Sequence, residues 1–421
     1  MYNRIKLFIK DFEVIYHNQF GFRKNHSTQH ALTAIMENIR NNLDNKTFSA
    51  AVFVDLEKAF DTVNHNILIS KLEHYGITSI ASKWIRSYLS NRKQTVTLNG
   101  VTSSSKNVTC GVPQGSILGP LLFILYINDL NLALKNCSVF HFADDTNLLF
   151  NSKNPNSLHK VINEELNILF DWLCANRLSL NALKTEFIIF RPPRANLDKR
   201  VPLRLNGVTI YESPKIKYLG IILDSRLTWK HHINELCKKL GRALGMVYKV
   251  RQLTTPSVLR SLYFSLFNSH LAYGLSIWGS CSAQYSDRLK LLQKRIVRAI
   301  QFADYDAPTK PIFKELNILA LEDLYKVQIA SLMWDYDHGS LPHSLNVFFT
   351  RRSTIHSINL RNASDNRIYT ANRFNTNYGK NSFSRIGGNL LNGLKDSGIY
   401  DSNDSKYVFI KKYKTSIFEQ Y

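Results

Sequence analysis

The spacing of hydrophobic residues changes near Tyr218 and divides the chain into two parts. In the first part, short apolar runs predict buried strands at 49–54, on both sides of a turn within 138–150, and at 186–190. Helical spacing between them predicts helices at 66–75, 80–90 and 158–173, and an apolar helix that runs on to Leu134. In the second part the helical period dominates and predicts long helices at 229–250, 256–273, 286–302 and 319–336.

Turn residues separate these runs. Asn99-Gly100 and Asn206-Gly207 each stand between short alternating segments, which is the strongest local signal for a β-hairpin. Residues 111–120 (GVPQGSILGP) form a Gly/Pro-rich loop before the apolar helix. Residues 1–45 favour helical pieces around a link at 20–24, and the Asn/Ser-rich residues after His338 give no clear pattern.

Composition narrows the class of protein. Of the 421 residues 44% are hydrophobic, which is enough for a buried core and excludes general disorder. The five cysteines are scattered without C-x-x-C spacing, so a disulfide scaffold or zinc ribbon is not expected, and a reducing, intracellular compartment fits better. The longest apolar stretch, near 120–127, is far shorter than the ~20 residues that span a bilayer, so no membrane partner is expected.

The charge indicates a polyanionic partner. Lys and Arg number 54 against 32 Asp and Glu, a formal net charge of +22. Residues 191–260 hold 15 basic and 4 acidic residues, a net +11 that is half of the excess. Nucleic acid is the default partner for such a charge, although basic residues that only solubilise a large surface are the alternative.

Three acidic residues are the candidate reactive groups. Asp55 follows the strand 49–54, and Asp144 and Asp145 occupy the turn within 138–150. Carboxylates at the ends of apolar strands call for a compensating cation, and hard oxygen ligands suit Mg²⁺. Two such ions would serve an in-line phosphoryl displacement. Asp-Asp is also common in ordinary turns, so on the residues alone both interpretations stay open.

The ordered motifs favour the first interpretation. The chain reads VFVDLEKAFDTV from Val52, GVPQGSILGP from Gly111 and FADD from Phe142, with QFGFR at 19–23, LSLNALKT at 178–185 and YLGIILD at 218–224. In this order the segments resemble the reverse transcriptases of non-LTR (LINE-type) retrotransposons, closely over about residues 15–230 and loosely beyond.

The resemblance implies an α+β fold of right-hand polymerase type. It implies partial fingers at 1–48, a palm with an antiparallel sheet and a primer-grip hairpin at 49–225, and an α-helical thumb at 226–337. Residues 338–421 form a C-terminal region of unknown role. The implied activity is RNA-directed DNA synthesis on an RNA template from a DNA primer and dNTPs, with two Mg²⁺ ions that Mn²⁺ can replace.

Individual roles carry over by position. Asp55, Asp144 and Asp145 would be the catalytic metal ligands, and Lys184 would protonate the pyrophosphate. The resemblance places Phe60 (as steric gate), Gln114, Gly115 and Arg23 at the dNTP, and Tyr218, Leu219 and Gly220 at the primer end. It also assigns backbone contacts to Lys238, Lys239, Arg242, Lys249 and Arg251. For each of these an ordinary core, loop or solvated-surface role is the alternative.

Departures from the family leave other functions open. Only about 18 residues precede Gln19, without the Arg-Pro-Ile-Ser-type motif of related fingers, so the sequence looks like a truncated reading frame. An endonuclease would then belong to a longer, element-encoded product, and a nuclear location is expected although no import signal is evident. The alternatives are an inactive nucleic-acid-binding remnant, a group II intron maturase-like enzyme, and an unrelated two-metal nuclease.

Overall fold

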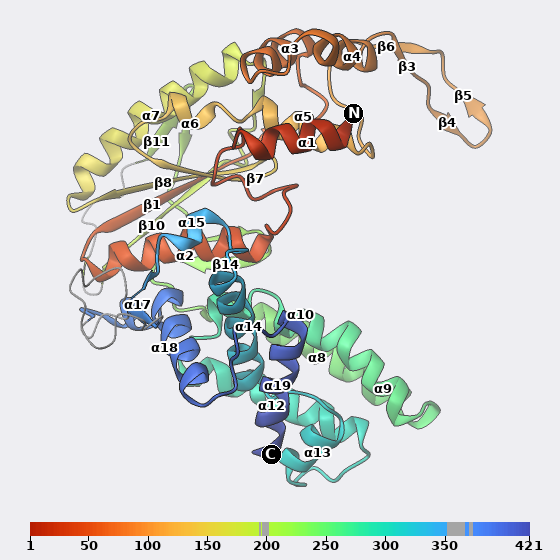
Figure 1. Cartoon of the computed structure of the whole chain (residues 1–421), viewed down its shortest axis with the longest axis vertical. Coiled ribbons are helices and arrows are strands. Elements are labelled where there is room, and N and C mark those ends of the chain that lie inside the picture. The colour runs from red at the N-terminus through yellow and green to blue at the C-terminus, as the bar shows by residue number, and fades with distance from the viewer. Residues whose placement is uncertain (193–194, 196–201, 352–366, 370–373) are drawn as a thin grey trace. The chain divides into compact units, whose positions relative to one another are not determined.

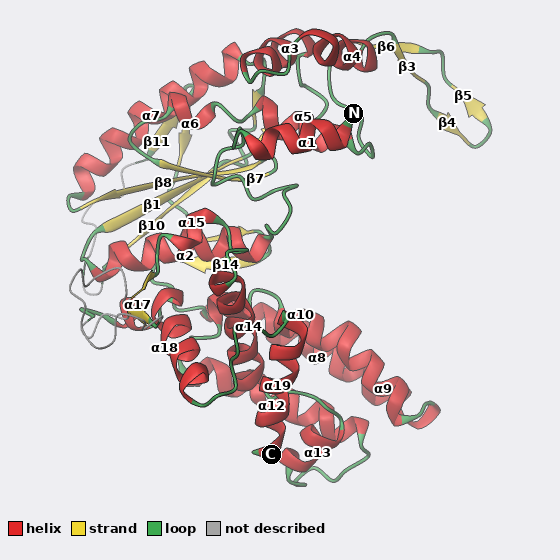
Figure 2. Cartoon of the chain, in the orientation of Figure 1, coloured by secondary structure: helices red, strands yellow, loops and turns green. Residues whose placement is uncertain are grey.

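The computed structural model describes residues 1–192, 195, 202–351, 367–369 and 374–421. The chain forms two compact units. A sheet unit contains residues 1–31, 47–189 and 195–213, and a helical unit contains residues 32–46, 190–194 and 214–421. Strands gather in the first unit and helices dominate the second (Figure 2), which confirms the expected α+β class.

The sheet unit is built from the following elements. Its helices are α1 (Tyr2–Asp11), α3 (His65–His74), α4 (Ser79–Leu89), α5 (Leu118–Tyr126), α6 (Leu130–Ala133) and α7 (Pro155–Ala175). Its strands are β1 (Phe48–Val54), β2 (Leu56–Glu57), β3 (Arg92–Gln94), β4 (Thr97–Leu98), β5 (Val101–Thr102), β6 (Lys106–Val108), β7 (Ser138–Phe142), β8 (Asp145–Ser152), β9 (Ser179–Leu180), β10 (Glu186–Phe190), β11 (Leu203–Leu205) and β12 (Val208–Ile210). Helix α2 (Thr28–Asp44) begins in this unit and continues in the helical unit.

A four-stranded sheet in the order β10-β1-β8-β7 forms the centre of this unit. Strand β8 pairs antiparallel with β1 on one side and with β7 on the other. Strand β1 is buried along nearly its whole length, as its continuous apolar run predicted. Helix α7 lies against β8 and β11 (Figure 1), and its apolar residues, spaced three or four apart, enter the core at Leu158, Ile162, Leu166, Leu169 and Leu173.

Both predicted Asn-Gly hairpins are confirmed. Leu98 pairs with Val101 around Asn99-Gly100, and Leu205 pairs with Val208 around Asn206-Gly207. All four turn residues have positive φ, as a type I′ turn requires. The first hairpin forms the end of an exposed ribbon with β3 and β6 that extends from α4 (Figure 1).

The prediction of one apolar helix as far as Leu134 is wrong. Helix α5 ends at Tyr126, and the short α6 starts only at Leu130. Between them, the Asn128 side chain accepts a hydrogen bond from the Tyr16 N–H and donates one to the Val14 carbonyl, both at 2.8 Å. An Asn side chain that bonds to distant backbone in this way competes with continued helix.

The helical unit contains the rest of the elements. Its strands are β13 (Lys215–Tyr218), β14 (Ile221–Asp224), β15 (Thr350–Arg351) and β16 (Ile368–Tyr369). Its helices are α8 (Lys230–Val250), η1 (Arg251–Leu253), α9 (Pro256–Leu262), η2 (Tyr263–Asn268), α10 (Ser269–Ala272), α11 (Leu275–Trp278), α12 (Ala283–Ile300), α13 (Thr309–Glu315), α14 (Leu321–Asp337), α15 (His343–Asn346), α17 (Asn377–Lys380), α18 (Phe383–Asp396) and α19 (Lys406–Glu419).

The four long predicted helices are present, and the C-terminal region packs with them. The helix predicted at 256–273 contains a π-helical segment, η2, between α9 and α10. Helices α18 and α19, whose fold the sequence left open, lie against α14 (Figure 1). In the described parts of the chain, no helix has the length and apolar character needed to cross a bilayer.

Candidate active site

The β7–β8 hairpin places two acidic residues at its turn. Phe142 pairs with Asp145, so only Ala143 and Asp144 form the loop between the strands. Ala143 has a φ of 57°, a left-handed value that two-residue hairpin loops require at their first position. Asp144 follows it in the loop, and Asp145 is the first residue of β8. The hairpin with an acidic turn that the sequence predicted is therefore present.

Asp55 lies at the same edge of the sheet because β1 is the neighbour of β8. Val54, the last residue of β1, pairs with Thr146. Asp55 directly follows Val54, and Asp145 directly precedes Thr146. The structure thus brings together Asp55, Asp144 and Asp145, which are about 90 residues apart in the sequence.

The ionisation of Asp145 responds to its surroundings. Partial burial of Asp145, together with repulsion from the carboxylates of Asp144 and then Asp55, raises the pKa of Asp145 to about 6. Its side chain still reaches the surface. A concentration of negative charge at an accessible edge of a sheet is an environment that a cation would stabilise.

The donor chemistry at this edge fits a hard divalent ion. Carboxylate oxygens are the ligands that Mg²⁺ prefers, and the remaining positions are usually completed by water and substrate phosphates. Among the residues that the structure describes, however, no three His, Cys, Asp or Glu side chains are already arranged as a metal-binding group. The assignment of the three aspartates as metal ligands therefore stays a prediction.

The predicted dNTP residues Phe60 and Gln114 lie close together. The Val112 N–H donates a 2.8 Å hydrogen bond to the Phe60 carbonyl, and the exposed Gln114 donates through Nε2 to Asp61 at 2.8 Å. The half-buried Phe60 ring stacks on Phe123 with 4.3 Å between centroids. The loop that carries Gln114 is thus attached to the segment that follows Asp55.

Two glycines give this loop its shape. A Cβ on Gly111 would come within 2.8 Å of the Asp61 carbonyl oxygen, so only glycine permits this approach of two backbones. Gly111 also donates to the Val63 carbonyl and has a φ of +86°. Gly115 has a φ of +78° but is exposed, and a Cβ there would meet nothing within 4 Å. The space beside Gly115 can therefore admit another molecule.

Lys184 lies in a loop that is bonded to the backbone of Asp55. The Asn181 N–H donates a 2.9 Å hydrogen bond to the Asp55 carbonyl, just beyond the β2–β9 pairing of Leu56 with Leu180. Lys184 donates its own N–H to the Asn181 carbonyl, and its side chain is exposed. The LSLNALKT segment is thus attached to the main chain at and just after Asp55.

Arg23 makes contacts within its own loop. Its Nη1 donates to the carbonyls of Tyr16 at 3.0 Å and Gln19 at 3.1 Å. Burial lowers the pKa of this guanidinium. The neighbouring Phe22 ring is exposed and lies edge-on to Phe60, 6.2 Å between centroids. Arg23 therefore stabilises the loop that lies next to Phe60, the predicted steric gate.

The predicted primer-grip residues belong to the helical unit. Leu219 and Gly220 form the two-residue turn between β13 and β14, with φ values of 42° and 82°. The Leu219 carbonyl accepts a 2.6 Å hydrogen bond from the Tyr273 hydroxyl, and a Cβ on Gly220 would lie 3.1 Å from the Tyr273 ring. Tyr218 is buried. The hairpin is real, and its role at a primer end stays a prediction.

Of the five basic residues predicted to contact a nucleic-acid backbone, four lie on α8 and the fifth, Arg251, directly follows it. Its apolar face, which includes Ile233, Leu240 and Val247, is buried. The side chains on its outer face are exposed at Lys238, Lys239, Arg242 and Lys249. The next residue in the set, Arg251, instead stacks its guanidinium on Phe302 at 4.8 Å from the ring centroid. Four of the five are thus accessible cations.

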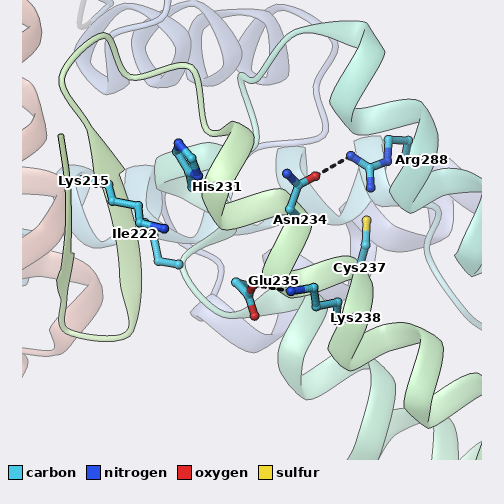
Figure 3. A pocket seen from close by; sticks show the side chains of 8 residues that line it. All are labelled: Lys215, Ile222, His231, Asn234, Glu235, Cys237, Lys238 and Arg288. Atoms are coloured by element: carbon cyan, nitrogen blue, oxygen red, sulfur yellow. Dashed lines mark hydrogen bonds and ion pairs between the residues drawn. The ribbon is translucent and has the colours of Figure 1, made fainter.

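A cavity of about 450 Å³ lies beside this helix within the helical unit. Its lining, drawn in Figure 3, comes from the β13–β14 hairpin, α8 and α12: Lys215, Ile222, His231, Asn234, Glu235, Cys237, Lys238 and Arg288. Lys238 forms a 2.8 Å ion pair with Glu235, and Arg288 donates to Asn234 at 2.6 Å. Hydrogen bonding and charge from Lys238, with smaller effects from Lys215 and Lys239, lower the pKa of Glu235. The lining of the cavity therefore contains one carboxylate, that of Glu235, and three Lys and Arg side chains: Lys215, Lys238 and Arg288.

Sequence reasoning gave no role to several residues that the fold places beside the acidic turn or the cavity. Lys215 and Arg288 are separated from Lys238 in sequence, so only the fold shows that they share a cavity. Gln19 and Gly21 lie in the QFGFR motif, which was recognised as a motif without a role for either residue. The motif itself was the available signal for Gln19 and Gly21, because their contacts with residues about 120 positions away leave no local pattern in the sequence.

The family can now be stated from comparison with known proteins. A family model described as reverse transcriptase (RNA-dependent DNA polymerase) matches residues 1–223. The chain belongs to this family, which confirms the resemblance noted in the sequence.

Named relatives come from transposable elements. The chain is 29% identical over 337 residues to a probable RNA-directed DNA polymerase from transposon BS of Drosophila melanogaster, covering 76% of this chain and 36% of the relative. It is 28% identical over 317 residues to the RNA-directed DNA polymerase from mobile element jockey of the same species, covering 72% and 34%. With the Pol polyprotein of the type-1 retrotransposable element R1 of Bradysia coprophila it shares 28% identity over 349 residues, covering 80% and 31%. The chain thus spans about a third of the length of these relatives.

Among solved structures, apo telomerase from Candida tropicalis matches with a TM-score of 0.42 at 14% sequence identity, covering 84% of this chain and 60% of that chain.

Proposed function

We propose that this chain is an RNA-directed DNA polymerase, which adds dNMP units to a DNA primer on an RNA template. The observation that carries the proposal is the meeting of Asp55, Asp144 and Asp145 at one edge of the sheet, where they raise the pKa of Asp145. Membership of the reverse transcriptase family supports it. The matched segment makes up only about a third of the length of these relatives, so the activity of this chain needs its own test.

The reaction forms one bond and breaks one. The primer 3′-hydroxyl oxygen bonds to the α-phosphorus of the dNTP, the bond from that phosphorus to the bridging oxygen breaks, and pyrophosphate leaves. The hydroxyl passes its proton to solvent water, and the leaving pyrophosphate gains one from Lys184 Nζ, which solvent then restores. Lys184 is suited to this role because it is exposed and its loop is bonded to the backbone of Asp55.

Asp55, Asp144 and Asp145 would hold two Mg²⁺ ions, for which Mn²⁺ could substitute. When bound, such ions supply positive charge that stabilises the attacking and leaving oxygens. The chain's own contribution is a set of carboxylates fixed by a short turn and by the end of a buried strand. That fixation lowers the cost of ordering the reactants.

The dNTP would bind between the Gln114 loop and Phe60. Gly115, which has a positive φ and open space beside it, lets the loop backbone approach a ligand, and Gln114 is exposed there. Phe60 would face the sugar, where a ring excludes a ribose 2′-hydroxyl. Arg23 would support this site by stabilising its own loop, in which the neighbouring Phe22 contacts Phe60.

The helical unit would hold the template–primer. Tyr218, Leu219 and Gly220 would grip the primer end, and the α8 cations with Arg251 would contact backbone phosphates. The cavity between Lys215, Lys238 and Arg288 is suited to a phosphate group because its cations outnumber its single carboxylate. Such contacts set affinity and salt dependence and leave sequence choice to base pairing.

In these terms residues 1–48 are partial fingers, 49–225 the palm, 226–337 the thumb, and 338–421 a C-terminal region of unknown role, in which α18 and α19 pack onto α14. The compact units group the β13–β14 hairpin with the thumb helices. The endonuclease would be supplied by a longer protein that the same transposable element encodes. The chain would act in the nucleus, which imaging of a tagged chain in cells would test.

Primer extension tests the activity directly. Wild-type chain, an RNA template, a DNA primer, dNTPs and Mg²⁺ should give template-length DNA, and Asp144→Ala should abolish it. A wild type that binds template–primer without extending it would favour a nucleic-acid-binding remnant. Extension that survives Asp144→Ala would show that the catalytic residues are misassigned.

A further inference from the structure

We propose that Gln19 and Gly21 are positioning residues that fix the turn Ala143–Asp145 and thereby the carboxylates on it. The inference rests on the proposed polymerase function for its catalytic consequence. The contact itself can be tested without that function.

Residues 18–21 lie along the outer strand of the sheet. The His141 N–H donates to the Asn18 carbonyl at 2.9 Å, and the Phe20 N–H donates to the His141 carbonyl at 2.8 Å. Gln19 therefore forms a parallel bridge with His141 in β7. This short segment supports β7 up to its turn, on the side opposite β8.

The Gln19 side chain bonds directly to the turn. Its Oε1 accepts hydrogen bonds from the Ala143 N–H at 3.2 Å and from the Gly21 N–H at 2.8 Å. Gln19 is only 2% exposed, so water cannot readily replace this acceptor. Ala143 has a positive φ, which is unfavourable for a residue with a Cβ and persists only when neighbouring groups hold it. Gln19 is the side chain that supplies a bond there.

Gly21 determines how closely the two segments approach. A Cβ at this position would overlap the Ala143 nitrogen and lie 3.0 Å from the Ala143 Cα and 3.1 Å from the Phe142 carbonyl carbon. All three are backbone atoms, which cannot rotate away as a flexible side chain could. Any larger residue at position 21 must therefore displace the turn that carries Asp144.

A matched set of variants separates positioning from folding. Gly21→Ala displaces the turn, and Gln19→Met removes the acceptor with little change in side-chain size. Gly393→Ala on α18 is the control, because a Cβ there would meet nothing within 4 Å. For each protein we would measure kcat, the KM for dNTP, template–primer affinity, the melting temperature, and amide hydrogen exchange of a peptide that contains residues 141–146.

The expected result for Gly21→Ala and Gln19→Met is a fall in kcat of about 100-fold, because a displacement of about 1 Å has that effect on a catalytic group. KM and template affinity should stay near wild type and thermal unfolding should stay cooperative, with a melting temperature lowered by the lost contact, while amide exchange at the turn accelerates. Unchanged kcat and unchanged exchange would overturn the inference, and so would equal loss of kcat and template affinity in both variants. If the wild type extends no primer, the proposed function fails, and the exchange rates alone then decide whether Gln19 and Gly21 fix the turn.

Discussion

Asp224 connects the β13–β14 hairpin to the first long helix of the helical unit, and its removal gives a sharp test of this part of the structure. It is buried at the end of β14. Its Oδ1 accepts from the N–H groups of Arg226 and Thr228 at 3.2 and 3.0 Å. Its Oδ2 accepts from the Thr228 hydroxyl at 3.2 Å and the Trp229 N–H at 2.9 Å. One carboxylate thus fixes the whole loop that leads into α8.

The change Asp224→Asn keeps one acceptor oxygen and replaces the other with a donor. The bond from the buried Trp229 N–H is lost, because that donor then faces an NH₂ group, whereas the Thr228 hydroxyl can reverse its role and accept. A hydrogen bond to a charged group contributes about 1.5–3 kcal/mol, and an unsatisfied buried donor costs about 1–3 kcal/mol. Because these contributions overlap, we expect a loss of about 3 kcal/mol in the free energy of unfolding. That loss corresponds to a decrease of about 6–12 °C in melting temperature for a domain of this size.

Thermal unfolding followed by circular dichroism measures this effect. Thr228→Val is the matched control, because it removes the hydroxyl bond to Oδ2 and a long 3.4 Å bond from the Lys230 N–H but keeps the carboxylate, and it should cost about 1 kcal/mol. Primer extension by Asp224→Asn below its melting temperature should give shorter products, since the predicted primer grip loses its anchor to α8. A melting temperature equal to that of the wild type would refute the four-bond account of Asp224.

Three further predictions concern other parts of the chain. Phe60→Val should raise rNTP incorporation relative to dNTP by about 10- to 100-fold, measured by single-nucleotide extension, because a smaller side chain admits a 2′-hydroxyl; unchanged discrimination would remove Phe60 from the sugar site. Lys215→Gln and Arg288→Gln should each reduce the slope of log Kd for template–primer against log salt by about 1. Lys411→Gln on the exposed face of α19 is the control and should leave the slope unchanged. Equal slopes for all three variants would mean that the cavity binds no phosphate. Glu37→Ala should lower the free energy of unfolding, measured in urea, by about 3–5 kcal/mol. The buried Glu37 accepts hydrogen bonds from the N–H groups of Phe383 and Ser384 at the start of α18, and it neighbours the buried Arg40. Wild-type stability would show that Glu37 does not hold α18 in this way.

Local patterns predicted the elements of the sheet unit well. Strand β1 and the β7–β8 hairpin were predictable because continuous apolar runs flank residues with strong turn preference. The Asn-Gly hairpins follow from the positive φ that both turn residues need. The break after Tyr126 could not be predicted, because it depends on bonds from Asn128 to residues 112 and 114 positions earlier in the chain.

The C-terminal region was unpredictable for the same reason. Glu37 reaches the start of α18 across 346 positions, and no local periodicity encodes such a contact. The π-helical segment η2 also depends on tertiary contacts, since the Tyr263 hydroxyl within it accepts a 3.0 Å bond from Gln293.

The candidate site divides in a similar way. The positions of Asp55 and the acidic turn followed from strand ends, and their order resembled a known family. The supporting residues did not follow, because Gln19 and Gly21 act through contacts with Ala143 that have no signature within the motif itself. The cavity beside α8 is lined by β13, β14 and α8 together with α12, whose Arg288 lies 50 residues after Lys238, so its cations could be assigned only from the fold.

The most direct test of the central claim separates chemistry from binding. Single-turnover incorporation of one dNTP and equilibrium binding of the same RNA template–DNA primer would be measured for wild type, Asp55→Asn and Asp144→Asn. The carboxylate account predicts that each variant loses at least about 1,000-fold in rate, since transition-state charge stabilisation is the largest catalytic contribution, while template–primer affinity stays at the wild-type value. Wild-type rates in either variant, or a parallel loss of rate and affinity, would contradict it.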